Sequence, residues 1–489
     1  MTVWRSRIDV GSPEFAANQE AMLARVAELR ALEARAEAAS ERRRARFEAR
    51  GQLTPRERLA RLLDPGMPFL RLHSLAGYRI DAPAQESIPG ASVILGIGHV
   101  AGARCLVWVD DSGIKAGAFG AKTLPAVLSA QALAKRHKLP LVHLVESAGA
   151  NLMEYQVEGW SEGGALFRNL AQLSAMGIPV ISVLHGPSTA GGAYMPGLSD
   201  VVIGVRGNGM AALAGAALVA AATGERSDDR ELGGAEMHAE VSGLVEHLAD
   251  DDAHAVAMAR DAVRRLGWSR GRAAPPDGPP PRHAPQELAG VVPPDPATPY
   301  EAREVAARLV DASDFEDFQP RFGVSTVCLR AEIGGHPVGL LANNGPIDPA
   351  GAQKAAHFLQ ICEQTGLPVI FLHNTTGYIV GAASERAGMI KHGSKMIQAV
   401  ANLTVPKIAL HVGASYGAGN YGMCGWAYEP DFLFAWPNAR TGVMGGAQAA
   451  GTMSLVARAG ARRRGEAVDE ARLAAQEGAI RDHFEDQAD

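Results

Sequence analysis

Cysteines are scarce in this chain of 489 residues, and the four that it has show no paired spacing. Cys105, Cys328, Cys362 and Cys424 therefore indicate neither a zinc site nor a disulfide framework. No apolar run approaches the roughly 20 residues that a membrane-spanning helix needs, and the first ten residues lack the apolar core of a signal peptide. We therefore expect a cytoplasmic protein that binds neither a metal nor a membrane.

Excess positive charge is also absent, because the formal net charge is -6. A chain of this charge gives no reason to expect nucleic acid or an anionic membrane as a partner. An apolar content of 47% and a charged content of 20% are typical of a globular protein, and the length predicts two or three domains. Glycine is abundant, with 55 residues, which indicates many tight turns or close backbone contacts.

A proline-rich stretch divides the chain. Ten prolines lie between Pro275 and Pro299. Since proline at this density continues neither a helix nor a central strand, we expect residues 269–299 to form an extended, semi-rigid connector. The predicted parts are then an N-terminal helical arm at 1–63, a first domain at 64–268 and a second domain at 300–489.

The arm is predicted from an apolar stripe that recurs on one helical face after Pro13. Its members are Phe15, Leu23, Val26, Leu29 and Leu32. The basic segment 42–50 is either a solvated helical face or a contact for a phosphate-bearing ligand or an acidic neighbour. A second short helix is expected from Pro55 to Leu63, before the turn signal Asp64-Pro65-Gly66.

A glycine-rich segment at 413–425 follows an apolar, strand-like run at 405–412. Its five glycines permit close backbone contacts and unusual dihedral angles. If the strand leads through this turn into a helix, the backbone N–H groups at the helix start have no partner within the helix. Such groups hold an anion, or an oxygen that becomes anionic during a reaction. The alternative is a turn in which small residues serve only for packing.

The two domains repeat each other. Strand-like runs begin at Leu139 and Ile178 in the first domain, 39 residues apart, and at Leu367 and Val405 in the second, 38 residues apart. The copies are offset by about 228 residues, and helical segments at 163–176 and 388–401 lie between the runs. This order predicts βαβ units around a mostly parallel sheet, with ligands at the strand ends. A duplicated α/β fold with small-residue turns in each copy indicates two related half-sites.

Longer motifs carry a family resemblance. They are LDPG at 63–66, AGGAY at 190–194, ATGE at 222–225, LGGA at 232–235, GMIKHGSKMIQA at 388–399, SYGAGNYGMCG at 415–425 and WPNARTGVMGG at 436–446. Over nearly the whole chain the sequence resembles the carboxyltransferase (β) subunit of biotin-dependent acyl-CoA carboxylases, most closely that of methylcrotonyl-CoA and geranyl-CoA carboxylases. The resemblance implies two crotonase-like domains, a β hexamer, and a partner α subunit with biotin carboxylase and biotin carrier functions. It also implies an active site shared between the first domain of one subunit and the second domain of its neighbour.

The implied reaction moves CO2 from carboxybiotin on the partner subunit to an acyl-CoA. Two oxyanions then need stabilisation, one on the thioester and one on the biotin ureido oxygen, and backbone N–H donors at preorganised turns serve both. The resemblance assigns the amides of Ala148 and Gly149 to the thioester and those of Ala418 and Gly419 to biotin. The other biotin-side residues that it implies are Gly417, Asn420 and Tyr421. No side-chain nucleophile, metal or protein base is required, and the sequence shows no credible triad or metal cluster.

The acyl-CoA side corresponds to the family's region at 322–354, together with a lysine-containing turn in the first domain. The residues that it implies are Lys115, Gly117, Asn343, Asn344, Gly345 and Lys354. For Lys115, contact with a CoA phosphate and a solvated lysine both remain open. For the segment 186–194, lining of the acyl pocket and simple packing both remain open.

The chain also departs from the family pattern. The family often has Gly-Gly where this chain has Ala148-Gly149, so we expect the methyl group of Ala148 to crowd the thioester. Family members continue beyond Asp489 with helices that pack on the second domain. The expected substrate is a branched unsaturated acyl-CoA, 3-methylcrotonyl-CoA or geranyl-CoA. The alternatives are carboxylation of propionyl-, acetyl- or longer acyl-CoA, a decarboxylase component, and a non-catalytic scaffold.

Other reactive side chains are expected to be structural. His143, His185, His373 and His411 lie on apolar strands, which is typical of core or interface histidines, and His373 and His392 are the first exceptions to consider because they flank the second domain's helix and turn. Ser188 does not lie in a nucleophile elbow, which disfavours a hydrolase. Cys424 is expected to be a buried small hydrophobe, with redox sensitivity as the alternative.

Overall fold

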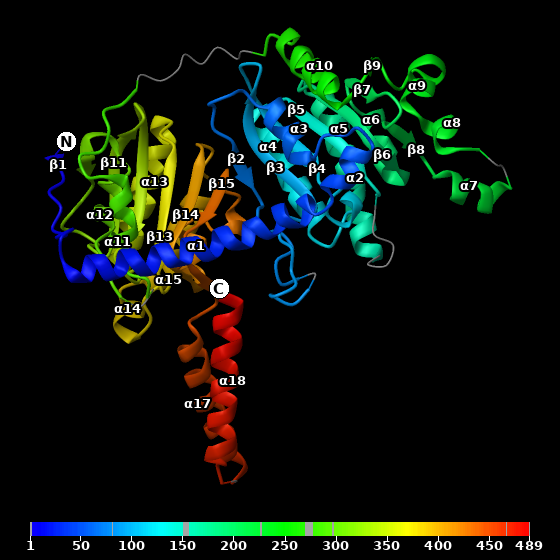
Figure 1. The fold of residues 1–489 in the computed structure, drawn as a ribbon. Helices are drawn as coiled ribbons and strands as arrows, with labels where there is room; N and C mark the ends of the chain where they lie inside the picture. Colours follow the sequence, from blue (N-terminus) through cyan, green and yellow to red (C-terminus); the bar gives the residue numbers. More distant parts are fainter. Residues whose placement is uncertain are drawn as a thin grey trace. The chain divides into compact units, whose positions relative to one another are not determined.

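The structure, a computed structural model, describes residues 2–80, 82–149, 156–224, 227–268, 277–295, 298–465 and 467–488. The chain forms two units, each built around an eight-stranded mixed β-sheet (Figure 1). The N-terminal unit comprises Leu29–Gly271, and the C-terminal unit comprises Met1–Glu28 and Arg272–Asp489. This architecture confirms the predicted α/β class with two repeated domains and an N-terminal helical segment.

The sheet of the N-terminal unit has the strand order β2-β3-β4-β5-β6-β7-β9, with β8 paired to the end of β6. The strands are β2 (Leu70–Leu72), β3 (Val93–Val100), β4 (Ala103–Asp110), β5 (Leu141–Ser147), β6 (Val180–Thr189), β7 (Val201–Val205), β8 (Met210–Ala212) and β9 (His247–Ala249). The pair β3–β4 is antiparallel, whereas the strands from β4 through β7 run parallel. Parallel neighbours need crossover connections, which the helices supply.

Helices cover both faces of this sheet. On one face, Leu59 of α3 (Pro55–Leu62) and Val256 of α10 (Asp252–Arg265) pack against Val142 and Ile181. On the other face lie α4 (Thr123–His137) and α5 (Val157–Ala175). Because both faces are covered, the central strands are almost continuously apolar. The remaining helices of this unit are α2 (Arg44–Ala49), α6 (Tyr194–Gly197), α7 (Ala216–Thr223), α8 (Asp229–Gly233) and α9 (Ala235–Met237), with single turns η1 (Lys115–Gly117), η3 (Ala190–Ala193) and η4 (His238–Ser242).

The C-terminal unit repeats this plan, with the strand order β1-β10-β11-β12-β13-β14-β15 and β16 paired to the end of β14. The strands are β1 (Thr2–Val3), β10 (Asp314–Asp317), β11 (Thr326–Ile333), β12 (His336–Asn343), β13 (Val369–Thr375), β14 (Lys407–Tyr416), β15 (Phe432–Ala435) and β16 (Arg440–Gly442). Helices α13 (Pro349–Thr365) and α15 (Met389–Ala401) cover one face. The other face packs against α12 (Ala302–Ala306), α11 (Leu288–Val291) and Phe15 of α1 (Pro13–Glu41).

The register of the strands confirms the internal repeat. In the N-terminal unit Ser147 of β5 pairs with Ser188 of β6, after a register shift, and in the C-terminal unit Thr375 of β13 pairs with Ser415 of β14, also after a shift. The short strands that follow are also equivalent. β8 pairs with the end of β6 at Ser188, and β16 pairs with the end of β14 at Ser415. Equivalent residues are therefore offset by 228 positions in the first strand (147 to 375) and by 227 in the second (188 to 415).

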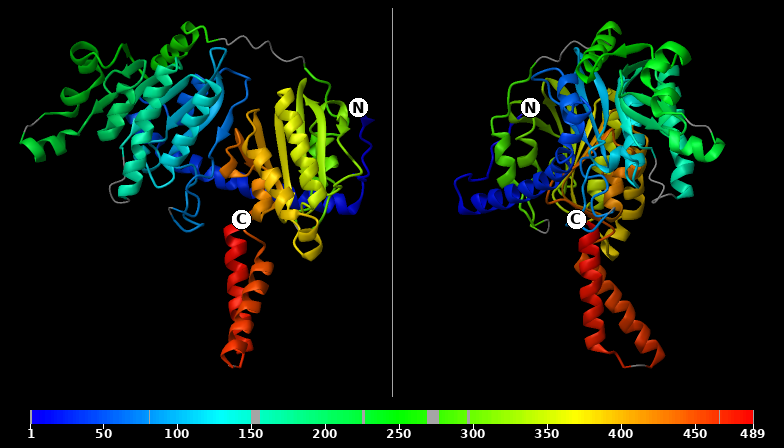
Figure 2. Two further views of the ribbon diagram at one scale, coloured as in Figure 1. Left: turned by 180° about the vertical axis from the view of Figure 1, so that it is seen from behind. Right: turned by 45° about the vertical axis from the view of Figure 1, so that its right-hand side comes forward.

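A helical hairpin completes the C-terminal unit. Helices α17 (Gly446–Arg464) and α18 (Glu470–Ala488) pack along each other and project away from the sheet of their own unit (Figure 2). An ion pair between Arg458 and Glu470, 2.6 Å apart, links them near the connecting turn. The shorter elements of this unit are α14 (Ala382–Arg386), α16 (Gly417–Gly422), η5 (Pro285–Glu287), η6 (Asp311–Ser313) and η7 (Trp426–Tyr428).

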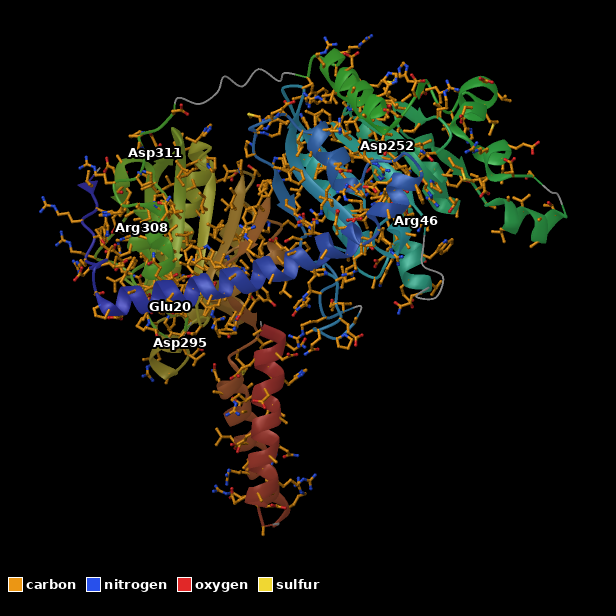
Figure 3. All side chains as sticks on the ribbon, in the orientation of Figure 1. Glu20, Arg46, Asp252, Asp295, Arg308 and Asp311 are labelled. Atoms are coloured by element: carbon orange, nitrogen blue, oxygen red, sulfur yellow. The ribbon has the colours of Figure 1, made fainter. Side chains whose placement is uncertain are left out.

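Part of the predicted connector belongs to the C-terminal unit. Val291 and Val292 are buried in its core, and the buried Arg308 pairs with Glu287 at 2.7 Å and with Glu304 at 2.9 Å (Figure 3). Residues 269–276 and 296–297 of the connector lie outside the described residues. The two units divide between Glu28 and Leu29, inside the predicted arm. The limits of the arm, domains and connector remain predictions.

Candidate active site

Each unit carries a turn of small residues directly after its central strand. In the C-terminal unit β14 leads into α16, whose first residue Gly417 has a φ of 56°. In the N-terminal unit β6 leads into η3, whose first residue Ala190 has a φ of 54°. Few residues other than glycine adopt this left-handed region without strain. Since Ser188 and Ser415 are equivalent, Ala190–Ala193 is the counterpart of residues 417–420.

The turn of the C-terminal unit places two predicted donors at the start of a helix. Ala418 is exposed, and Gly419 is buried against the end of β13. A Cβ atom at Gly419 would lie 2.8 Å from the Cα atom of Gly377 and 3.0 Å from Cγ2 of Thr375, so the position has no room for a side chain. The N–H groups of a helix's first turn have no acceptor in their own helix. This geometry suits the binding of an oxygen that carries negative charge.

The predicted thioester donors have a different environment. The amide of Ala148 donates to the carbonyl of Ala116 at 3.0 Å, and the amide of Gly149 donates to Oγ of Ser147 at 3.1 Å. The Phe119 amide also donates to the carbonyl of Gly149, which locks the two turns together. Both amides therefore have an acceptor within the unit. Their role at the thioester remains a prediction, and it requires these hydrogen bonds to be exchanged.

The two assigned donor pairs do not lie at equivalent positions of the repeat. The positions equivalent to Ala418 and Gly419 are Gly191 and Gly192, whereas Ala148 and Gly149 follow the preceding strand, β5. Gly191 is exposed, as is its counterpart Ala418. Gly192 is buried, as is its counterpart Gly419. The signal that identifies this counterpart is the spacing from the paired serines, because residues 191 and 418 each follow by three positions.

The other predicted biotin-side residues gather at the same turn. Asn420 is half-buried, and its Nδ2 atom donates to Oγ of Ser415 at 2.9 Å. Tyr421 is exposed, and its ring lies 5.8 Å from that of Tyr428. Gly417 begins the helix. The structure thus brings together Gly417, Ala418, Gly419, Asn420 and Tyr421 as one surface of the C-terminal unit.

The predicted acyl-CoA residues are divided between the two units. In the N-terminal unit Lys115 is exposed, whereas Gly117 is buried with a φ of 68°. A Cβ atom at Gly117 would lie 2.4 Å from the carbonyl oxygen of Glu146, so this glycine permits the contact between the two turns. Oγ of Ser147 donates to the carbonyl of Gly117 at 2.7 Å. Gly117 therefore shapes the turn that bears Ala148.

Of the four predicted acyl-CoA residues of the C-terminal unit, Asn343 and Lys354 are buried and Asn344 and Gly345 are half-buried. Asn343 is buried and accepts from the amide of Asn374 at 3.5 Å, and Asn344 accepts from the amide of Ala302 at 2.8 Å. Lys354 is buried, donates to the carbonyl of Thr326 at 2.8 Å, and has a pKa lowered chiefly by burial. Gly345 follows with a φ of 149°. Their contact with acyl-CoA remains a prediction.

Comparison with known proteins places this fold in a family. A family model described as a carboxyl transferase domain matches residues 46–487. The chain is 49% identical, over 441 residues, to a "Probable biotin-dependent acyl-coenzyme A carboxylase beta2 subunit" of Mycobacterium tuberculosis, covering 90% of this chain and 82% of that protein. It is 43% identical, over 455 residues, to a biotin-dependent 3-methylcrotonyl-coenzyme A carboxylase beta1 subunit of the same organism, covering 91% and 84%.

The chain belongs to the carboxyl transferase domain family. The crystal structure of the geranyl-CoA carboxylase β subunit of P. aeruginosa matches it with a TM-score of 0.92 and 49% identity, over 100% of this chain and 90% of that chain. The matched residues include both units and therefore both small-residue turns. The family resemblance inferred from the motifs is confirmed.

A buried charge network lies beneath the Ala148 turn of this carboxyl transferase domain. Arg58 pairs with Glu146 at 2.6 Å and with Asp252 at 2.8 Å, and Asp252 also contacts Nδ1 of His185 at 2.8 Å. Burial, aided by the charge of Arg58, lowers the pKa of His185. Although burial raises the pKa of Asp252, the hydrogen bond with His185 and the charge of Arg58 hold it below its ordinary value. The network thus keeps His185 neutral and Asp252 ionised beside Arg58.

His373 and His411 of the C-terminal unit are neutral core residues. The rings of His373 and His411 lie 4.3 Å apart, and both side chains are buried. Burial lowers the pKa of His373 well below its usual value and lowers that of His411 to about 4. Neither is protonated at neutral pH, in keeping with the interpretation of strand histidines as core residues.

Other chemistries find little support in the described residues. No group of three or more histidine, cysteine or acidic side chains in the described ranges is placed to hold a metal ion. Burial raises the pKa of Cys105 to about 12 and that of Cys362 to about 11, which disfavours a thiolate nucleophile. Cys424 is buried, as expected for a small hydrophobe. Within the described part of the chain, no helix is long and apolar enough to cross a membrane.

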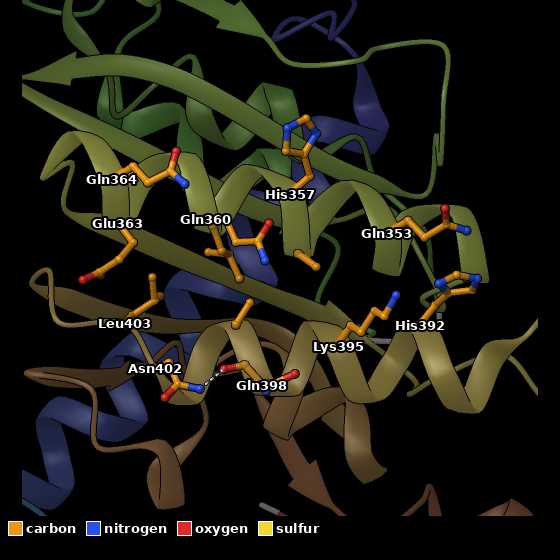
Figure 4. A pocket seen from close by; sticks show the side chains of 13 residues that line it. Gln353, His357, Gln360, Glu363, Gln364, His392, Lys395, Gln398, Asn402 and Leu403 are labelled. Carbon is orange, nitrogen blue, oxygen red and sulfur yellow. Dashed lines mark hydrogen bonds between the residues drawn. The ribbon is translucent and has the colours of Figure 1, made fainter.

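A polar groove of about 790 Å³ runs between α13 and α15 (Figure 4). His357 and Gln353 line it from α13, and Lys395 and His392 from α15. The equivalent helices α4 and α5 of the N-terminal unit frame a groove of about 600 Å³. Because the groove recurs at the same place in both units, it is a property of the repeated fold. None of the predicted oxyanion donors lines either groove.

Proposed function

We propose that this chain is the carboxyltransferase (β) subunit of a biotin-dependent acyl-CoA carboxylase, which transfers CO2 from carboxybiotin on a partner subunit to an acyl-CoA. The observation that carries the proposal is the turn at Ala418 and Gly419. It offers helix-start amides beside a backbone position where only glycine fits. The names of the M. tuberculosis relatives and of the P. aeruginosa structure support the same activity.

The residues of the turn fit a planar ureido group. Gly417 is half-buried and Ala418 is exposed, and Asn420 and Tyr421 flank them with a polar and an aromatic side chain. Biotin, when bound as its carboxylated form, supplies CO2 and the base that removes the acidic proton of the acyl thioester. In this assignment the Ala418 and Gly419 amides donate to the ureido oxygen. One such donor is worth about 3 to 4 kcal/mol of barrier height.

The N-terminal unit is assigned to the acyl thioester. The proposed donors are the amides of Ala148 and Gly149, with Gly117 and Lys115 beside them. A thioester oxygen that becomes an enolate oxyanion accepts from these amides once their present acceptors, Ala116 and Ser147, release them. The enolate carbon then attacks CO2, so that the chain contributes orientation and backbone dipoles and no covalent intermediate.

The substrate is proposed to be a branched unsaturated acyl-CoA. Relatives and a solved structure named for 3-methylcrotonyl-CoA and geranyl-CoA carboxylases support this class. Asn343, Asn344, Gly345 and Lys354 remain proposed for the acyl-CoA side, on the family resemblance. Propionyl-, acetyl- and longer acyl-CoA and the decarboxylase direction are alternatives that the assay below separates.

The proposed assembly is a β hexamer with a biotin-carrying α subunit. In the C-terminal unit, the exposed side chain of Ile390 lies on α15, next to α16, and the exposed Val443 follows β16, with its carbonyl oxygen 3.2 Å from where a Cβ atom of Gly417 would lie. In the N-terminal unit, Leu213 and Tyr194 are exposed around the equivalent turn. Exposed apolar groups of this size are typical of surfaces that a partner covers. We propose that the N-terminal unit of one subunit and the C-terminal unit of its neighbour share one site, in a cytoplasmic enzyme.

Carboxylation of an acyl-CoA panel tests the proposal. The chain is combined with a biotinylated α partner, ATP and labelled bicarbonate, and fixation into 3-methylcrotonyl-, geranyl-, propionyl-, acetyl- and octanoyl-CoA is compared. We expect the highest kcat/KM with one of the two branched unsaturated thioesters. Complex formation without fixation into any thioester would favour a non-catalytic scaffold. The observation that favours this second candidate is that the Ala148 and Gly149 amides already have acceptors.

A further inference from the structure

The two units differ in one layer directly beneath their small-residue turns. In the N-terminal unit this layer is apolar, with Val145, Leu184 and Ala211 in one buried cluster against Ala193. Val145 pairs with Leu184 in the sheet, as His373 pairs with His411 in the other unit. The four apolar positions Val145, Leu184, Ala193 and Ala211 thus correspond to His373, His411, Asn420 and Thr441.

Two of these side chains, Asn420 and His373, are joined through Ser415 by hydrogen bonds. Nδ2 of Asn420 donates to Oγ of Ser415 at 2.9 Å, and Oγ of Ser415 lies 2.8 Å from Nδ1 of His373. Oγ of Ser415 thus joins Asn420 to His373, whose Nε2 atom is buried without a hydrogen-bond partner. Alongside, Thr441 and Nδ1 of His411 lie 3.0 Å apart.

The equivalent serine in the N-terminal unit lacks these contacts. Ser188 is fully buried, and its Oγ atom has no hydrogen-bond partner. The neighbours that partner Ser415 are replaced there by Val145 and Ala193. Both units have a serine at this position, but only Ser415 has polar side chains around it. The serine itself therefore goes with the shared backbone fold, whereas its hydrogen bonds are specific to the C-terminal unit.

The polar layer is not required by the fold. Burying polar groups is unfavourable unless they are hydrogen-bonded, and the N-terminal unit forms the same strands and turn over an apolar cluster. The polar chain ends at Asn420, next to Gly419 in α16. Space for the Asn420 side chain exists because residue 425 is glycine, where a Cβ atom would lie 1.8 Å from Oδ1 of Asn420. The backbone of the turn is the same in both units, and the polar contacts are added in the C-terminal unit alone. This difference indicates that the polar side chains serve a function at the α16 turn.

We propose that His373 and Ser415 are positioning residues that orient Asn420 and the start of α16 for the biotin ureido group. This inference rests on the proposed carboxyltransferase function and specifies how the C-terminal unit became the biotin side of a duplicated fold. His373 acts through Ser415, and Ser415 acts through Asn420. Neither needs to exchange a proton with a substrate.

Substitutions that restore the N-terminal unit's residues test the proposal. His373→Val and Ser415→Ala remove links of the chain, His373→Asn retains a polar atom near the position of Nδ1, and Ser188→Ala is the matched control. Binding of free biocytin to the full-length chain is followed by ligand-observed NMR. KM values for biotin and for the carboxylated acyl-CoA are measured with the same chain in the transferase half-reaction run from carboxylated acyl-CoA to free biotin.

His373→Val and Ser415→Ala are expected to weaken biocytin binding and raise the KM for biotin about tenfold, as for one lost hydrogen bond. The KM for the carboxylated acyl-CoA stays within about twofold, His373→Asn recovers most of the affinity, and Ser188→Ala leaves biocytin binding unchanged. Unchanged biocytin binding in the first two variants, or equal effects on both KM values, overturns the inference alone. A wild-type chain that neither binds biocytin nor transfers carboxyl groups overturns the proposed function and this inference with it.

Discussion

Alanine at position 419 is the sharpest test of the turn at the start of α16. In Gly419→Ala the new Cβ atom would lie 2.8 Å from Cα of Gly377 and 3.0 Å from Cγ2 of Thr375. Ordinary van der Waals contact begins near 3.4 Å, so one backbone segment has to move by at least 0.6 Å, the difference between 3.4 and 2.8 Å. The atom that resists is backbone at the end of β13, and it cannot rotate away as a side chain would.

The magnitude follows from this displacement. Alanine retains the N–H donor at 419, so the effect arises from the position of the donors alone. A misplacement of about 1 Å lowers rates by about 100-fold, and a shift of 0.6 Å is therefore expected to lower kcat by about 10-fold or more. Overpacking of this kind also destabilises a protein by about 1–3 kcal/mol.

The assay compares kcat in acyl-CoA carboxylation with the thermal midpoint of unfolding. The control is Gly451→Ala in α17, where a Cβ atom meets nothing within 4 Å and where alanine favours the helix. Gly451→Ala is expected to retain kcat. A folded Gly419→Ala protein with the wild-type kcat would refute the assignment of this turn to catalysis.

Three further substitutions probe the interior. Arg58→Met leaves the buried Glu146 and Asp252 without their cation. The free energy of unfolding, measured by urea titration, is therefore expected to fall by about 3–5 kcal/mol. An unchanged urea midpoint would contradict a stabilising role for the network. His411 has a folded-state pKa of about 4 against 6.5 unfolded, so the unfolded chain binds more protons and stability declines as pH falls from about 6.5 to 4. His411→Leu, the residue of the equivalent position 184, should flatten that decline, and parallel pH curves would argue against it. Gly290→Ala places a Cβ atom 2.5 Å from the Phe15 ring and is expected to lower unfolding free energy by about 1–3 kcal/mol, whereas wild-type stability would show that Phe15 adapts freely.

Local patterns sufficed to predict the duplicated strands. Leu139-Pro140 and Leu367-Pro368 each introduce a continuous apolar run, and β5 and β13 begin directly after the prolines at Leu141 and Val369. Buried parallel strands are continuous apolar runs because helices cover both faces of their sheet. The interval between the two apolar runs of each domain is long enough for a crossover helix. In the structure α5 lies in the first of these intervals and α15 in the second.

Hydrogen bonds between turns that are distant in the sequence could not be predicted from local sequence patterns. The acceptor of the Ala148 amide is the carbonyl of Ala116, in a turn with left-handed backbone at Lys115 and Ala116, residues that glycine preferences do not reveal. The burial of Lys354 likewise depends on its distant contact with Thr326. A lysine in a motif predicts a surface charge by default, since burial of a cation is unfavourable unless its donors are satisfied.

The charges of the two units diverged at equivalent positions. Asp110 and Glu146 at the ends of β4 and β5 correspond to Asn343 and Asn374 at the ends of β12 and β13, so each acid has an amide as its counterpart. The local bond is kept, because Asp110 accepts from the amide of residue 146 as Asn343 accepts from that of residue 374.

The close approach to the neighbouring strand is also kept. A Cβ atom at Gly186 would lie 2.5 Å from the Glu146 side chain, and one at Gly413 would lie 2.5 Å from that of Asn374. The N-terminal unit thus braces its turn from one sheet face with a buried cation and carboxylates, whereas the C-terminal unit uses neutral amides there and neutral histidines on the other face. A site that stabilises a developing anion gains from neutral surroundings, because a buried carboxylate nearby opposes the new charge. The neutral surroundings of the C-terminal unit are therefore in keeping with its proposed role at the ureido oxyanion.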